Sequence, residues 1–173
     1  MLFRSLLIFA SWSWKLLHMG EPPGLRDQII HDVILCAQAK GGVLNWSELS
    51  AFPVAGELRP VKDRQAGIFN PTWLDGYTLS ISSTSEKKGI GPFGYDDSID
   101  ESGLLRYAYA ARYGTGGMNN KLRQAMDARV PLIYFEWIAP GEYVPIAPVF
   151  VVGDNPDRKS TRLNSSHVKR SRM

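Results

Sequence analysis

The sequence predicts a small α+β domain in which helices flank a curved or barrel-like β-sheet. Near the start of the chain, apolar residues recur at helical spacing. From Gly67 onward the pattern changes to short β-like runs separated by Gly, Pro, Asn and Asp. Many short strands with only two or three helices are typical of an α+β domain built around a curved sheet.

Three segments have helical patterns. The first is an amphipathic helix over Leu25–Ala39, which Gly41 and Gly42 should end. We interpret its apolar stripe as core packing; the stripe comprises Leu25, Ile29, Val33, Ile34 and Ala37. The second helix is short and starts at Asn45 or Ser47, either of which can cap it, and should bury Leu49 and Phe52. The third covers residues 119–128, with Asn119 as its cap.

Strands are expected between and after these helices, at residues 67–69, 77–81, 104–110, 132–138 and 149–152. A polar loop over residues 82–94 and a glycine-rich stretch over residues 114–117 separate them. The apolar runs 131–135 and 149–152 are interpreted as core strands.

Both ends of the chain resemble translated sequencing adapter. Residues 157–167 read DRKSTRLNSSH and residues 1–5 read MLFRS, and common library adapters encode both strings in one frame. Non-native ends have to be set aside before the fold is considered. We therefore expect a non-native or upstream segment at 1–18, the domain at 19–156 and an adapter-like tail at 157–173. The adapter-like ends should have no packed role, and the domain should be a truncated piece of a longer gene.

The two ends also carry most of the basic charge. The formal net charge of the chain is +3; residues 1–18 contribute +2 and residues 157–173 contribute +5, which leaves −4 for residues 19–156. A nucleic-acid site must therefore be a local basic patch. The single cysteine, Cys36, excludes a disulfide framework and a cysteine-based zinc site, which fits a cytoplasmic protein. The apolar run 6–14 is too short to cross a bilayer, so no membrane partner is expected.

Eight short motifs follow one another in the order found in a known family. They are GIFNP (67–71), LSI (79–81), YDD (95–97), YAY (107–109), NNKLRQAM (119–126), PLIYF (131–135), APGEY (139–143) and APVFVV (147–152). The series resembles the N-terminal PUA-like domain of McrA-like HNH restriction endonucleases, which is related to the SRA domain that reads modified cytosine. The resemblance covers about residues 25–154. It implies a PUA-like or SRA-like fold, duplex DNA with a modified cytosine as partner, and an HNH nuclease domain after it in the parent protein.

The credible residues do not assemble a catalytic site. An HNH site needs histidines and an Asn or Asp to hold one divalent metal and activate a water. Residues 19–156 contain one histidine, His31, on the polar side of the first helix. We therefore predict no catalytic residue, no metal site and no cofactor in this fragment, which we interpret as the recognition half of a nuclease. A homodimer through the missing region stays open.

Recognition of one base inside a duplex requires a pocket. The base has to be flipped out at a cost of a few kcal/mol, which stacking and edge hydrogen bonds must offset. Aromatic stacking is worth roughly 1–3 kcal/mol per base, and a carboxylate can accept from the exocyclic amine of cytosine. The expected pocket residues are Trp73, Tyr95, Asp96, Asp97, Tyr107 and Tyr109, with Phe93 as a further loop aromatic. The tyrosines at 107 and 109 face one side of a strand, so core packing is the alternative, and the aspartates could simply close a turn.

Phosphate contacts are expected from the local basic groups and from one helix end. Arginine and lysine neutralise phosphates, and the N–H groups at a helix N-terminus also bind them. The expected residues are Lys87, Lys88, Arg106, Arg112, Asn119, Lys121 and Arg123. An ordinary solvated face is the alternative for each of them.

Two functions remain open at this point. A DNA-recognition module predicts a basic concave face beside an aromatic pocket. A PUA-like domain that binds RNA or a protein predicts no pocket deep enough for a base. The shortage of histidine and cysteine argues against a stand-alone hydrolase.

Overall fold

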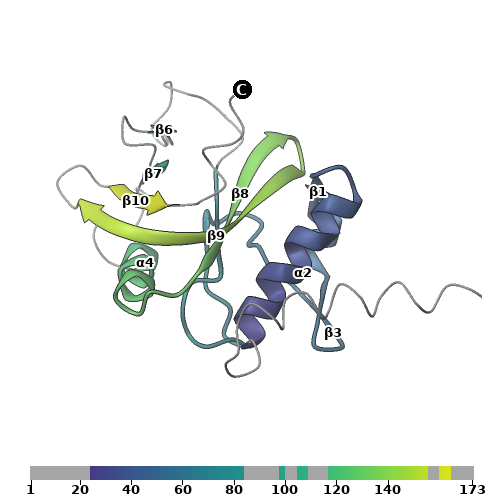
Figure 1. The fold of residues 1–173 in the computed structure, drawn as a ribbon, viewed down its shortest axis with the longest axis horizontal. Coiled ribbons are helices and arrows are strands. Elements are labelled where there is room, and N and C mark those ends of the chain that lie inside the picture. Colours follow the sequence, from purple (N-terminus) through teal and green to yellow (C-terminus); the bar gives the residue numbers. More distant parts are fainter. Residues whose placement is uncertain (1–23, 84–97, 100–104, 109–116, 156–159, 165–173) are drawn as a thin grey trace, which may run out of the picture.

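Two helices lie on opposite faces of one β-sheet in the computed structural model, which describes residues 24–83, 98–99, 105–108, 117–155 and 160–164 (Figure 1). The long β8–β9 hairpin crosses the middle of the view, with α2 on its right and α4 at the lower left. This arrangement confirms the predicted α+β class. Within the described part of the chain, no helix is long and apolar enough to cross a membrane.

The three described helices lie close to where the sequence predicts them. The first, α2 (Leu25–Ala39), has the expected bounds, and α3 (Trp46–Ser50) is capped by Asn45, whose side chain accepts from the Glu48 N–H at 3.1 Å. The Glu48 carboxylate accepts from the Asn45 N–H at 2.8 Å, which completes a capping box. The third, α4 (Met118–Asp127), begins one residue early with Gly117 as its cap, so the expectation that Asn119 caps it is wrong.

The main sheet has eight strands among the described residues. Their order is β4-β5-β8-β9-β10-β7-β6, and β1 pairs with the start of β9. Only β5 and β8 run parallel; the other pairs are antiparallel. The bounds are β1 (Leu44–Asn45), β4 (Ile68–Phe69), β5 (Ser80–Ser82), β6 (Ser98–Ile99), β7 (Leu105–Ala108), β8 (Leu132–Ala139), β9 (Glu142–Asn155) and β10 (Ser160–Asn164). Along these strands the sheet runs from β4 to β6 without closing into a barrel.

A separate hairpin joins α3 to the sheet. It consists of β2 (Phe52–Val54) and β3 (Glu57–Arg59), and Phe52 packs into the core from it. Ala55 and Gly56 form its turn, both with positive φ, as a tight hairpin connection requires. The burial of Leu49 and Phe52 is confirmed, although Phe52 lies on this strand and not in the helix.

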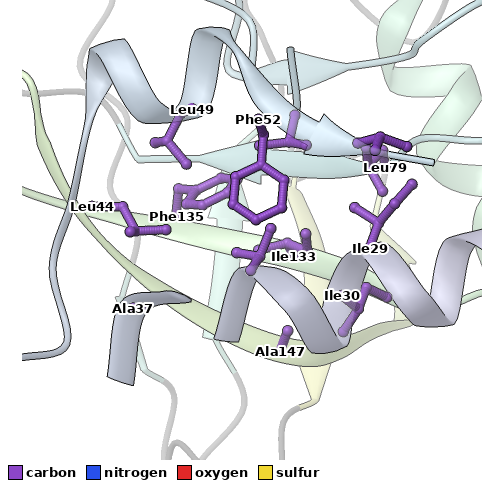
Figure 2. Packing of buried hydrophobic residues seen from close by; sticks show 13 residues of the cluster. Ile29, Ile30, Ala37, Leu44, Leu49, Phe52, Leu79, Ile133, Phe135 and Ala147 are labelled. Atoms are coloured by element: carbon purple, nitrogen blue, oxygen red, sulfur yellow. The ribbon is translucent and has the colours of Figure 1, made fainter. Parts of the chain in front are cut away.

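The two faces of β8 belong to two different cores. Ile133 and Phe135 pack with Ile29 and Val33 of α2 in the larger cluster, where Figure 2 shows Phe52 and Leu49 closing over Phe135. Leu132 and Tyr134 point to the other face and pack with Leu122 of α4. Because successive side chains of a strand alternate between faces, β8 must be apolar at every one of these positions, which explains the unbroken run LIYF.

Burial on α2 differs from the predicted stripe at several positions. Leu25 is exposed and Ile34 is only partly buried, whereas Arg26 and Ile30 are buried. In the first turn of α2, the residue that faces the interior is therefore an arginine. This end of the helix lies against backbone carbonyls and not against apolar side chains.

Arg26 ties three segments together. Its Nε and Nη2 donate to the two carboxylate oxygens of Asp75 at 2.7 and 2.6 Å. Its Nη1 donates to the carbonyls of Thr78 at 2.8 Å and Pro131 at 2.9 Å, so α2, the turn before β5 and the start of β8 share one guanidinium. The hydrogen bond from Arg26 holds the pKa of Asp75 below its usual value, against the opposing effect of burial.

The C-terminal part of the sheet is larger than the sequence suggests. The strand expected at 149–152 is the middle of β9, which has 14 residues. The expectation that residues 157–173 have no packed role is wrong for Ser160–Asn164, because β10 pairs with both β9 and β7 and buries Thr161 and Leu163. Leu163 joins the core beneath α4. That the tail resembles translated adapter stays a prediction about its origin.

Shortening the chain to end at Pro156 should destabilise it. The shorter chain loses the Leu163 side chain, whose burial is worth roughly 1.5–3 kcal/mol, and leaves β7 without its partner β10. We expect a loss of about 2–4 kcal/mol in the free energy of unfolding by urea titration. Leu163→Ala in the full chain should account for much of it. An unchanged midpoint would show that the tail has no packed role after all.

Removing the Arg26 guanidinium should be among the most damaging single changes. Arg26→Met leaves the carbonyls of Tyr77, Thr78 and Pro131 without this donor, together with the Asp75 carboxylate, which is 39 % exposed. An acceptor left unsatisfied in the interior costs about 1–3 kcal/mol, so we expect a loss of at least that size. Arg26→Lys keeps the charge but not the fork, so an intermediate loss is expected. Arg129→Ala, at an exposed arginine, is the control and should stay within about 0.5 kcal/mol of wild type in urea. Equal stability of Arg26→Met and the control would contradict the role assigned to Arg26.

Candidate ligand cavity beside the β8–β9 turn

A cavity of about 400 Å³ opens beside the turn that joins β8 to β9. Its volume lies within the range of small-molecule sites, roughly 300–1,000 Å³. Three segments form it: the link between β3 and β4, the end of β5 and the tip of the β8–β9 hairpin. The lining residues are Lys62, Arg64, Gln65, Ala66, Gly67, Ser82, Ser83, Trp137, Pro140, Gly141 and Tyr143. Among the described residues, this lining contains two cations and two large aromatic rings, and no carboxylate.

The hairpin positions the aromatic wall. Trp137 and Tyr143 are register partners across the turn, and Gly141 supplies the positive φ that the turn requires. The Trp46 N–H donates to the Gly141 carbonyl at 2.7 Å and ties the turn to α3. The Tyr143 ring meets Phe135 edge-on, with ring centroids 6.4 Å apart. The cavity wall is therefore anchored directly on the larger core.

The end of β5 supplies the hydroxyl wall. Because β5 runs parallel to β8, Ser82 lies beside Phe135 and the chain continues to Ser83 at the cavity. The Ser83 Oγ accepts from the Trp137 N–H at 2.8 Å, and the Ser83 N–H donates to the Phe135 carbonyl at 3.1 Å. These bonds hold the serine and the tryptophan in one fixed arrangement.

Lys62 is a buried cation in the cavity wall. Its ammonium donates to the Asp63 carbonyl at 2.9 Å and lies over the rings of Tyr143 at 4.4 Å and Trp46 at 5.6 Å. Cation–π contact stabilises the charged form. Burial acts in the opposite direction and is the larger influence, so the pKa of Lys62 lies below its ordinary value, although the nearby Asp63 charge partly offsets the shift. Burial likewise raises the pKa of Tyr143.

The link that follows Lys62 is held in shape by Asp63. Its Oδ1 accepts from the N–H groups of Gln65 and Ala66 at 2.7 and 2.6 Å, which closes a turn. Arg64 is exposed and also lines the cavity. The cavity therefore has a positive character, although residues 19–156 are net acidic.

A second, more open hollow of about 460 Å³ lies between the Asp75 turn and α4. Its lining includes the carboxylates of Asp75 and Asp127. This charge does not suit a polyanionic ligand, and Asp75 is already bound to Arg26. Over the described ranges, no group of three metal-ligating side chains gathers at either hollow or elsewhere.

Many of the residues that the sequence singles out lie outside the described residues. These are Lys87, Lys88, Phe93, Tyr95, Asp96, Asp97, Tyr109 and Arg112. Arg106 and Tyr107 are on β7, where Arg106 pairs in register with Arg162 and Tyr107 with Thr161 of β10. In the sheet order, β9 and β10 separate β7 from β8, so these positions are not on the hairpin that walls the cavity.

The remaining sequence candidates have structural environments of their own. Trp73 packs against the larger core, and the guanidinium of Arg59 lies 5.2 Å from its ring centroid. Asn119 is fully buried in α4, so its side chain is not placed to meet a phosphate. Arg123 donates from Nε to Asp154 at 2.5 Å and joins α4 to β9. Lys121 is partly exposed on the same helix. None of these four residues lines the cavity beside the turn.

The residues that line the cavity were not predicted from the sequence. One signal was available: a hairpin turn at Pro140-Gly141 would bring Trp137 and Tyr143 close together, and the register shift between Trp137 and Ala139 sets them opposite each other. No comparable signal pointed to Lys62, which reaches the cavity only through the tertiary fold.

Searches against protein-family models, curated proteins and solved structures return no match for this chain. The PUA-like resemblance therefore stays a prediction from the eight motifs.

Substitution of Arg123 distinguishes a structural role of this arginine from a role in binding phosphate. The Asp154 side chain is only 9 % exposed, so Arg123→Ala leaves a nearly buried carboxylate without this donor. We expect a loss of about 1–3 kcal/mol in urea unfolding, partly restored by adding Asp154→Asn. Lys121→Ala, on the same helix, should change stability by less than about 0.5 kcal/mol. If Arg123→Ala proved as stable as Lys121→Ala, the arginine would be available for phosphate as the sequence suggests.

Proposed function

We propose that this chain is a DNA-recognition domain that accepts a flipped, modified cytosine from duplex DNA into the cavity beside the β8–β9 turn. In this proposal it is the specificity module of a modification-dependent HNH restriction endonuclease acting in the cytoplasm. The observation that supports it most directly is the lining of that cavity, to which the part of the chain that the structure describes contributes two aromatic rings, two cations and no carboxylate.

Each part of the lining has a use in base recognition. Trp137 and Tyr143 offer ring surface on which a base can stack, at roughly 1–3 kcal/mol per base, which offsets much of the cost of flipping. The Ser82 and Ser83 hydroxyls can both donate and accept hydrogen bonds to a base edge. Arg64, at the exposed side of the cavity, can neutralise a phosphate of the flipped nucleotide.

The cavity also bears on the alternative function. A PUA-like domain that binds RNA or a protein partner without reading a base does not require a pocket of this volume, whereas a base reader does. A curved sheet with a helix on each face supports the PUA-like assignment of the fold (Figure 1). The segment that carries Tyr95, Asp96 and Asp97 follows Ser83 in the chain, and its role as the cytosine-selecting part of the pocket is part of this proposal.

Titration of the full chain against matched duplexes tests the proposal. The duplexes carry cytosine, methylcytosine, hydroxymethylcytosine or a phosphorothioate linkage, each at two salt concentrations. We expect tighter binding to at least one modified duplex, and a loss of about 1–3 kcal/mol in that preference for Trp137→Ala. Arg64→Ala should weaken binding to every duplex and lower the salt slope by about one.

Arg129→Ala is the matched control for Arg64→Ala, because it removes the same charge from an exposed residue at the other end of β8. It should leave affinity and salt slope nearly unchanged. Asp97→Ala should abolish discrimination but spare non-specific binding. Equal affinity for all four duplexes would remove the base-reading function, and no binding at low salt, together with binding to single-stranded RNA or to protein, would favour the alternative.

A further inference from the structure

Base stacking does not explain why the cavity wall contains Lys62. A phosphate contact calls for an exposed cation, which Arg64 provides. Lys62 is instead 4 % exposed and is part of the cavity wall. A buried lysine is uncommon and usually has a carboxylate partner. Among the contacts of the described residues, the Lys62 ammonium has one hydrogen bond, to a backbone carbonyl, and two ring faces.

These surroundings favour a lysine that can lose its proton. The charged and titratable neighbours of Lys62 are Asp63, Arg64 and Tyr143. Asp63 favours the ammonium, but its Oδ1 is already occupied by two backbone N–H groups. Burial favours the neutral amine and dominates, which lowers the pKa of Lys62. A desolvated lysine in a cavity is the usual form of an amine nucleophile toward carbonyl compounds.

We propose that Lys62 is a carbonyl-reactive amine, and that the cavity captures a planar aromatic aldehyde as a Schiff base. The neutral Nζ adds to the aldehyde carbon and forms a C–N bond. The carbonyl oxygen takes up the two protons that the nitrogen gives up and leaves as water, so that a C=N bond remains. No oxidant or reductant takes part in this step.

The rest of the lining defines the class of aldehyde. Trp137 and Tyr143 favour a flat ring, and Arg64 favours an anionic group on the same molecule. A small phosphorylated aromatic aldehyde and a formylated base within DNA share this chemistry. Capture of the small molecule does not require DNA binding, so this inference does not depend on the function proposed above.

Reductive trapping tests the inference with two probes. The full chain is incubated at pH 7 with pyridoxal 5′-phosphate, or with a duplex that carries one formylcytosine, and reduced with borohydride; the modified lysines are then identified by peptide mass spectrometry. A matched duplex with cytosine is the blank. We expect Lys62 to carry several-fold more adduct than Lys40 or Lys121, because Lys62 lines the cavity that would hold the aldehyde and its burial favours the neutral amine.

Two variants keep the outcome clear. Lys62→Arg should abolish the adduct while the unfolding midpoint shows that the chain is still folded. Arg64→Ala leaves Lys62 in place; it should lower the yield with pyridoxal 5′-phosphate several-fold but not with uncharged pyridoxal. An adduct with either probe supports the inference and identifies the source of the aldehyde. Modification spread evenly over the exposed lysines, with Lys62 unmodified by both probes, would overturn it, whatever the duplex titrations show.

Discussion

The fold depends on one constraint, the burial of both faces of β8. α2 and α4 have no common surface on which to pack, and each covers its own side of this strand through alternate residues. Two polar features of the fold lie at the ends of the same strand. Arg26 binds the Pro131 carbonyl just before it begins, and Trp137 borders the cavity near the point where it turns back. A shift of β8 by one residue would exchange the two cores and displace both features, so its register is strongly fixed.

Local periodicity was sufficient to predict the helices but not the extent of the sheet. α2 has its expected bounds because its pattern and its glycine stop are both contained in the sequence around it. β9 extends well before the strand expected at 149–152 and includes Pro145 and Pro148, although a proline removes a ladder hydrogen bond and hides such a strand in the sequence. β10 was dismissed because its residues resemble adapter translation, a criterion that concerns the origin of a segment and not its packing. The β2–β3 hairpin carried too few residues to give a period.

The candidate site was harder to predict than the fold, for a physical reason. The sequence around a basic residue of a helix does not show whether its side chain binds a ligand or a carboxylate of its own protein. Arg123 forms a salt bridge with Asp154. An asparagine near a helix start looks like a cap, but Asn119 is buried because the helix begins earlier, at Met118. The negative net charge of residues 19–156 does not reveal the positive cavity, because a net charge averages over surfaces that a ligand does not contact.

The position of β8 late in the chain also has a consequence for biosynthesis. Arg26 and the Pro131 carbonyl are 105 residues apart, and the parallel pairing of β5 with β8 joins residues that are 53 apart, such as Ser80 and Ile133 (133 − 80 = 53). At a translation rate of roughly 5–20 residues per second, several seconds therefore pass between the synthesis of α2 and that of β8, the strand that covers its apolar face. Contacts of such long sequence separation also slow folding, because chain closure must be paid for in entropy before the strands can pair. During that interval Ile29, Ile30 and Val33 are exposed together, which gives the nascent chain an apolar surface that a chaperone can bind.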